Sequence, residues 1–210
     1  MKVKKIKSHF KKVDPVIHKI IIKMEFNPLE QSKRSTSYFK KLCREIIAQQ
    51  LASKAAHAII SRFYDLFERK QVTPDKVLAF SEQELRNVGM SWAKARYARD
   101  LAQKVKDKEV RLNNLHNLDD KLVVEELIKV KGIGNWTAEM FLIFTLGRED
   151  VFSHGDLGLR KALQKLYGFK DKPNEKQINK IVNKWSPYKS YGCLALWRSV
   201  DKKEKISLLY

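Results

Sequence analysis

The chain has 210 residues, which is enough to bury a substantial hydrophobic core in one compact domain or in two small ones. Its 43 lysines and arginines against 24 acidic residues give a formal net charge of +19, which exceeds what solubility requires and indicates a polyanionic partner. No apolar run approaches the roughly 20 residues of a membrane-spanning helix, so no membrane association is expected.

The basic segment 1–12 lacks the apolar stretch and cleavage site of a secretory signal, and it is interpreted either as a nuclear address or as an arm that contacts DNA. The two cysteines, Cys43 and Cys193, lie far apart in the sequence and indicate a reducing compartment. The expected location is therefore the cytoplasm, at the nucleoid, in a prokaryote and the nucleus in a eukaryote.

Apolar residues recur at three- and four-residue spacing along almost the whole chain, and Pro and Gly are scarce, so the sequence predicts an all-α protein. A polar stretch at 27–37 predicts a loop. One helix is expected to begin at Tyr38 and to give way near Gln50. The residues expected to cap other helices are Asp14, Ser53, Thr73, Ser81 and Ser186.

The segment VKGIGNWTA joins two predicted helices and reads as a glycine hairpin. Gly132 and Gly134 flank Ile133, which can plug the core while both glycines adopt backbone angles that other residues avoid. The amides of Gly134, Asn135 and Trp136 then lie at a helix N-terminus, where N–H groups and the helix dipole favour a phosphate. The alternative is an ordinary αα turn with glycine at the helix C-cap.

Three successive motifs, VKGIGNWTA, LGREDVF and GDLGLR, resemble the helix-hairpin-helix (HhH-GPD) DNA glycosylase superfamily, and within it the alkylation-repair branch of 3-methyladenine DNA glycosylase II. The resemblance implies a helical fold of two domains with the active-site cleft between them. One domain, at 38–147, is expected to carry the hairpin at about 122–147. The second is expected to combine 1–37 with 148–210.

Asp156 is the residue expected to carry the chemistry. Aspartate is also a favoured N-cap, and this position precedes a predicted helix, so a purely structural role is the alternative. The resemblance implies a catalytic carboxylate that stabilises an oxocarbenium-like sugar and orients or deprotonates the attacking water. Asp150 and His154 compete for the role, and His154 is interpreted as a loop residue or a phosphate contact.

The resemblance also implies a pocket for an extruded base. Trp136 stands where bifunctional branches of the superfamily have a nucleophilic lysine, so no strand-breaking lyase step is expected. Trp136 and Trp197 are expected to stack on a cationic base, and a core role is the alternative for both. Met140 replaces a tyrosine that is common in the branch. Gln50 matches the residue that fills the gap in the duplex, with an ordinary helix-end role as the alternative.

The remaining expectations concern the DNA backbone and bound ions. Candidate backbone contacts besides the two glycines are Lys131, Asn135, Arg148, Arg160 and Lys161, although any single lysine of so basic a chain can be solvated surface. As in relatives, Na⁺ or K⁺ is expected on hairpin carbonyls, those of Lys129, Val130, Gly132 and Gly134. No cofactor is expected to be required, and two cysteines cannot hold the iron–sulfur cluster of some superfamily members.

The sequence therefore predicts a monomeric, monofunctional DNA glycosylase that removes alkylated purines of the 3-methyladenine and 7-methylguanine type from duplex DNA in base excision repair. Such purines already carry positive charge, so they can leave without a second, proton-donating acid. Two alternatives stay open. One is a helix-hairpin-helix DNA-binding protein without catalytic activity, and the other is a glycosylase for a deaminated or mismatched base.

Overall fold

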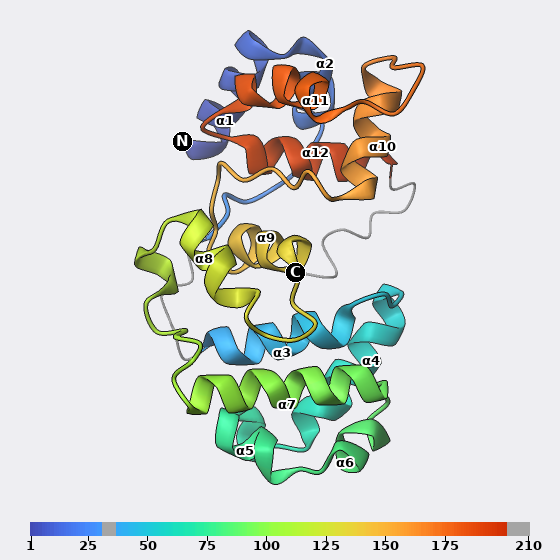
Figure 1. The fold of residues 1–210 in the computed structure, drawn as a ribbon. Helices are drawn as coiled ribbons and strands as arrows, with labels where there is room; N and C mark the ends of the chain where they lie inside the picture. The colour runs from blue at the N-terminus through green and yellow to red at the C-terminus, as the bar shows by residue number, and fades with distance from the viewer. Residues whose placement is uncertain (31–36, 201–210) are drawn as a thin grey trace. The chain divides into compact units, whose positions relative to one another are not determined.

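The computed structural model describes residues 1–30 and 37–200, and every regular element in these two ranges is a helix (Figure 1). The prediction of an all-α fold is therefore confirmed. None of the described helices is both long and apolar enough to span a membrane.

The chain divides into two compact units. The terminal unit comprises Met1–Gln31 and Leu142–Tyr210, and the central unit comprises Ser32–Phe141. The predicted domain limits lie a few residues further along the chain and stay a prediction. Residues 31–36 and 201–210, which include most of the predicted loop and the predicted C-terminal end of the second domain, lie outside the described residues.

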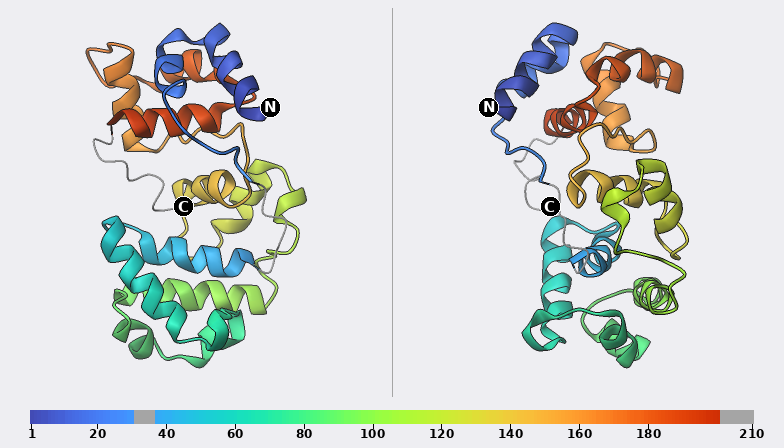
Figure 2. Two further views of the ribbon diagram at one scale, coloured as in Figure 1. Left: turned by 180° about the vertical axis from the view of Figure 1, so that it is seen from behind. Right: turned by 90° about the vertical axis from the view of Figure 1, so that its left-hand side faces the viewer.

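Five helices and one 3₁₀ turn build the terminal unit around an aromatic centre. They are α1 (Lys2–Val13), α2 (Pro15–Ile21), α10 (Leu157–Leu166), α11 (Glu175–Val182), η4 (Asn183–Trp185) and α12 (Lys189–Val200). Helix α12 packs against both α2 and α10 (Figure 2). Trp185 is fully buried, and its ring contacts Phe10 and Phe152 edge to face. The unit therefore has a hydrophobic core of its own.

Helix α1 was not expected from the sequence, which predicts an arm or a nuclear address at 1–12. Its residues form a regular helix because Ile6 and Phe10, one turn apart, are both fully buried in the core of the unit. Lysines cover the remaining faces of the helix. The abundance of lysine hides the short apolar stripe that decides the structure.

Asp14 ties the start of α2 to the centre of the terminal unit. Its Oδ1 accepts hydrogen bonds from the amides of Val16 and Ile17, which confirms the predicted helix cap. Its Oδ2 accepts hydrogen bonds from the Tyr167 hydroxyl at 2.6 Å and the Trp185 indole at 2.8 Å. Burial and the neighbouring Asp14 carboxylate raise the pKa of Tyr167, so its hydroxyl stays a donor.

The central unit is organised around its longest helix. Its elements are α3 (Tyr38–Ala48), α4 (Ser53–Asp65), η2 (Glu68–Lys70), α5 (Pro74–Ala79), α6 (Glu82–Asn87), α7 (Trp92–Lys106), η3 (Leu115–Asn117), α8 (Asp120–Leu127) and most of α9 (Asn135–Phe144). Helix α7 packs against α3, α5 and α6. The turn between α8 and α9 contains the two glycines of the predicted hairpin.

Two of the five predicted caps are wrong. Ser53 is the first residue of α4, and the N-cap position is occupied by Ala52, whose side chain cannot accept a hydrogen bond. Ser186 closes η4 and does not open α12, because its hydroxyl donates to Asp150 at 2.6 Å. The cap predictions confirmed by accepted amide hydrogen bonds are those at Asp14, Thr73 and Ser81.

Candidate functional site

Asp156 is the N-cap of α10 in the terminal unit, and its side chain is held in one orientation by two N–H donors. The Leu159 amide donates to Asp156 Oδ1 at 2.8 Å, and the Trp197 indole Nε1–H donates to the same oxygen at 3.3 Å. The residue is only 8% exposed. The structural role and the proposed catalytic role of Asp156 are therefore compatible, because capping fixes the carboxylate without consuming its charge.

An aromatic pair adjoins this carboxylate. The ring of Trp197, from α12, stacks on Phe144 with centroids 5.8 Å apart and an interplanar angle of 29°. Trp197 is partly buried, so it is neither a pure core residue nor a freely exposed one. Asp156 and Trp197, which the sequence separates by 41 positions, are brought into hydrogen-bond contact as one site.

Two neighbours of Asp156 were missed by the sequence analysis. A Cβ on Gly158 would lie 3.1 Å from Asp156 Oδ1 and 3.6 Å from Trp197 Cδ1, so glycine leaves the space in which the two groups meet. Leu157 is 72% exposed directly after the carboxylate. Both residues belong to the motif GDLGLR, but their position beside the Asp156 carboxylate becomes apparent only in the structure.

The competing residues in the preceding loop have other roles. Asp150 accepts hydrogen bonds from the Ser186 hydroxyl and the Lys189 amide, and its carboxylate pairs with Lys189 Nζ at 3.5 Å, so it fixes the start of α12. Burial lowers the pKa of His154, whose Nδ1 is buried without a partner among the described residues. The phosphate contact considered for His154 stays a prediction.

The glycine hairpin lies in the central unit, and only one of its glycines has the backbone that was predicted. Gly132 adopts φ +84°, and a Cβ there would lie 2.1 Å from Tyr97 Cδ2, so any other residue meets both strain and a ring. The prediction for Gly134 is wrong, because its φ is not left-handed and a Cβ there would meet no atom within 4 Å. The open surface around Gly134 leaves room for a ligand to approach the main chain.

Two side chains hold the hairpin from outside, one from the residue that follows α3 and one from α7. Gln49 Nε2 donates to the Gly132 carbonyl at 2.8 Å and contacts Thr137 Oγ1 at 3.3 Å. Asp100 accepts a hydrogen bond from the Lys131 amide at 2.8 Å. These supports were not predicted, since each joins residues that lie far apart in the sequence.

The hairpin residues differ in exposure. Lys131 and Asn135 are exposed, and Trp136, the second residue of α9, is 42% exposed, so it is not the core aromatic that was the alternative. Met140 is 2% exposed and packs in the interior, so its placement in a base pocket stays a prediction. An exposed tryptophan beside a helix N-terminus offers a flat apolar face next to a phosphate-binding position.

The other residues predicted to contact DNA lie on several different elements of the two units. Gln50 lies in the turn after α3 with φ +56°, next to the Gln49 that supports the hairpin, and its intercalating role stays a prediction. Arg160 donates to the Pro173 carbonyl at 2.9 Å, which fixes its guanidinium to a loop of its own unit. Arg148 is partly buried and Lys161 is exposed. Their phosphate contacts stay predictions.

The four carbonyls expected to bind a monovalent cation all accept hydrogen bonds within the protein. The donors are Lys104 Nζ to Lys129, the Ile133 amide to Val130, Gln49 Nε2 to Gly132 and the Ala138 amide to Gly134. One of these donors, Lys104 Nζ, is itself positively charged and lies 2.7 Å from the Lys129 carbonyl oxygen. Each of these carbonyl oxygens keeps a second lone pair, so the binding of Na⁺ or K⁺ at the hairpin stays a prediction.

Comparisons with known proteins point in one direction. A family model described as "HhH-GPD superfamily base excision DNA repair protein" matches residues 43–187. A Bacillus subtilis (strain 168) protein with the name "Putative DNA-3-methyladenine glycosylase YfjP" is 32% identical over 79% of this chain, and the chain spans 60% of its length.

Two solved structures resemble the chain closely. A DNA-3-methyladenine glycosidase from Bacillus halodurans is 33% identical with a TM-score of 0.75, over 92% of this chain and 88% of that one. The 3-methyladenine DNA glycosylase of Schizosaccharomyces pombe, in complex with abasic DNA, is 27% identical with a TM-score of 0.74, over 92% of this chain and 95% of that one.

Proposed function

The chain belongs to the HhH-GPD superfamily of base excision DNA repair proteins, and we propose that it is a DNA glycosylase that hydrolyses the N-glycosidic bond of alkylated purines in duplex DNA. The substrates are purines of the 3-methyladenine and 7-methylguanine type. The names of its relatives support this substrate class. The observation that carries the proposal is the Asp156 carboxylate, nearly buried and oriented by the Leu159 amide and the Trp197 indole.

The reaction needs one fixed negative charge. As the bond between base and sugar breaks, positive charge develops on the sugar, and the Asp156 carboxylate stabilises it electrostatically. The same group orients or deprotonates the water that attacks C1′. N3- and N7-alkylated purines leave as neutral molecules because they are already cationic, so no acid has to protonate them.

The aromatic residues define the kind of base that this enzyme accepts. In this proposal the stacked pair of Trp197 and Phe144 beside Asp156 favours a flat, electron-poor base, since a cation gains from an aromatic face. Trp136 cannot form a Schiff base, so the enzyme leaves an abasic site in an unbroken strand. The hairpin amides bind the phosphate backbone without reading sequence.

Base release separates this function from its competitors. The purified protein is incubated with duplexes that contain 3-methyladenine, 7-methylguanine, uracil or no lesion, and free bases are quantified by chromatography. We expect release of the two methylated purines and not of uracil, whose departure as an anion needs further contacts. DNA binding without any base release would support a non-catalytic binding protein instead.

The absence of lyase chemistry has its own readout. Reduction with borohydride traps a Schiff base between enzyme and DNA, so the reaction with a methylated duplex should give no covalent complex. The strand should break only after alkaline treatment of the abasic product. A trapped complex, or breakage without alkali, would contradict the monofunctional assignment.

A further inference from the structure

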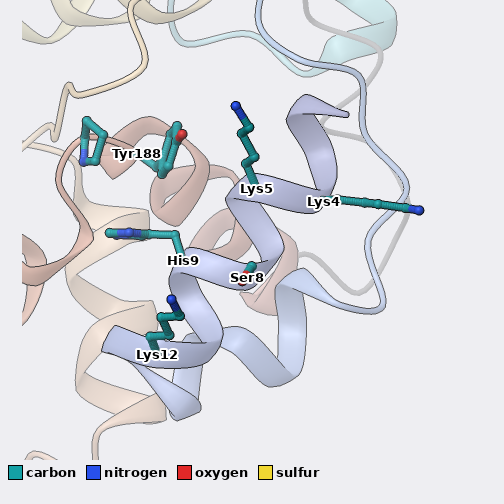
Figure 3. A pocket seen from close by; sticks show the side chains of 7 residues that line it. Lys4, Lys5, Ser8, His9, Lys12 and Tyr188 are labelled. Atoms are coloured by element: carbon teal, nitrogen blue, oxygen red, sulfur yellow. The ribbon is translucent and has the colours of Figure 1, made fainter.

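The terminal unit carries a basic hollow that the catalytic proposal does not use. It encloses about 550 Å³ between α1 and the turn before α12, and its lining residues are Lys4, Lys5, Ser8, His9, Lys12, Pro187 and Tyr188. None of them is acidic. Figure 3 shows Lys5, His9 and Lys12 on the side of α1 that faces Tyr188, while Lys4 extends away from it.

The lysines of α1 divide into those with a structural partner and those without one. Lys2 pairs with Glu149 at 3.1 Å, and Lys7 Nζ donates to the carbonyls of Ile22 and Met24. Lys5 and Lys12 are exposed, and neither forms an ion pair with any described residue. Their positive charge is therefore not neutralised within the described part of the chain.

His9, which lies between Lys5 and Lys12 in the sequence of α1, lines the hollow and is held in place. His9 Nε2 donates to the Trp185 carbonyl at 3.1 Å, because a carbonyl can only accept, and this bond fixes the ring. The His9 ring also meets Tyr188 edge to face, with centroids 5.2 Å apart. Lys5, His9 and Lys12 follow one another at spacings of four and three residues, so they share one helix face. The hollow is thus pre-organised.

We propose that this hollow, through Lys5 and Lys12, binds the phosphate backbone of the same DNA as a second site outside the hairpin. Seven helical residues separate the lysines by about 10 Å, which corresponds to about three nucleotides of one strand at 3.4 Å each. Tyr188 precedes Trp197 by nine positions, which is about 14 Å along a helix. The hollow therefore lies about 14 Å along α12 from the Trp197 indole that contacts Asp156, a separation that a bound duplex is long enough to span.

This inference rests on the proposed function only in taking DNA as the polyanion. An acidic protein could also meet two lysines, but the separation of Lys5 and Lys12 along α1 matches phosphates about three nucleotides apart, which favours a phosphate backbone. The hollow would add affinity without sequence preference.

The test compares two pairs of lysines in the terminal unit. The variant Lys5→Gln/Lys12→Gln removes the charges of the hollow, and Lys176→Gln/Lys180→Gln removes two exposed charges from α11, which takes no part in it. Affinity for an undamaged 20-base-pair duplex is measured over a range of salt concentrations. Circular dichroism and thermal melting confirm that both variants are folded.

We expect the hollow variant to bind DNA roughly ten- to a hundredfold more weakly at low salt, with a slope of log K against log salt reduced by about 1.8, or 0.9 for each lost phosphate contact. The control pair should lose at most about threefold and keep its slope. Equal losses in both pairs, or no loss in either, would overturn the proposal. Base release at saturating DNA should be unchanged in the hollow variant, so a failure of the glycosylase assignment would be seen separately.

Discussion

The hairpin and the Asp156 site use opposite means to present a functional group. At the hairpin the main chain is offered to the ligand, and it is held by side chains such as Gln49 and Asp100. At the start of α10 a side chain is offered, and it is held by the Leu159 main chain and by one indole. Binding to a repetitive backbone needs repeated main-chain donors, whereas bond cleavage needs one charge at one atom. From this difference we expect catalysis to depend on Asp156 alone and DNA binding to depend on several hairpin residues.

The two regions also differ in how they tolerate change. The surroundings of Gly134 are open, while Asp156 is 8% exposed and in contact with Trp197 and Gly158. We therefore expect substitutions at the hairpin to lower DNA affinity in proportion to the backbone shift they cause. Substitutions around Asp156 should change the rate of base release and leave affinity nearly unaffected.

The largest expected effect on stability is at Gly132. Gly132→Ala forces a side chain into a left-handed backbone and into the Tyr97 ring, so it should lower the free energy of unfolding by about 3–4 kcal/mol and weaken DNA binding at least tenfold. Gly134→Ala is the matched control and should change stability by less than about 0.5 kcal/mol. Denaturant unfolding and a DNA-binding titration measure both effects. Equal behaviour of the two variants would refute the assigned hairpin geometry.

A buried carboxyl in the central unit provides a contrast to Asp156. Burial raises the pKa of Glu45 to about 7, against the opposing effect of Arg44 and Lys41, from 4.5 in the unfolded chain. Its neutral form is favoured in the folded state, so its contribution to stability is complete below about pH 4.5 and is lost as the pH rises through about 7. The loss is at most about 3 kcal/mol.

The variant Glu45→Gln should remove this part of the pH dependence. The difference in unfolding free energy between variant and wild type, followed from pH 4 to pH 8, should shift in favour of the variant as the pH rises. A difference that stays constant over this range would show that the carboxyl ionises freely in the folded state. Base release should keep its pH profile, because Glu45 takes no part in the proposed reaction.

A smaller effect is expected at the donor that Trp197 supplies to Asp156. Trp197→Phe keeps an aromatic ring against Phe144 but removes the indole N–H, so it should slow base release about five- to tenfold, equivalent to about 1 kcal/mol. Single-turnover kinetics at saturating DNA measure the rate. Trp92→Phe, at an exposed site in the other unit, serves as control and should leave the rate unchanged. An unchanged rate in Trp197→Phe would mean that the indole does not orient the carboxylate.

The smallest effect is expected at Gln49. Gln49→Ala removes the donor to the Gly132 carbonyl and should cost about 1 kcal/mol of stability and a few-fold in DNA affinity, without a change in the rate at saturation. The control Gln83→Ala alters an exposed glutamine on α6. A change in the rate of base release with unaltered DNA affinity would mean that Gln49 contributes to catalysis. It would then contradict the assignment of binding to the hairpin and of catalysis to the Asp156 site.

The residues that could be predicted from the sequence are those whose signal is local. The caps at Asp14 and Thr73 and the left-handed Gly132 depend on neighbours in the chain, and the structure confirms them. The contact of Asp156 with Trp197 and the support of Gly132 by Gln49 join residues 41 and 83 positions apart, so no local pattern contains them. Helix α1 escaped prediction because its buried stripe is hidden among lysines.

The central claim is that Asp156 performs the chemistry and the hairpin performs the binding, and one pair of variants tests it directly. Asp156→Asn keeps a good helix cap and removes the charge, so we predict a loss of base release of about a thousandfold with unchanged DNA affinity. Gly132→Ala, measured beside it at saturating DNA, should release the methylated base at nearly the wild-type rate. Normal base release by Asp156→Asn would contradict the account.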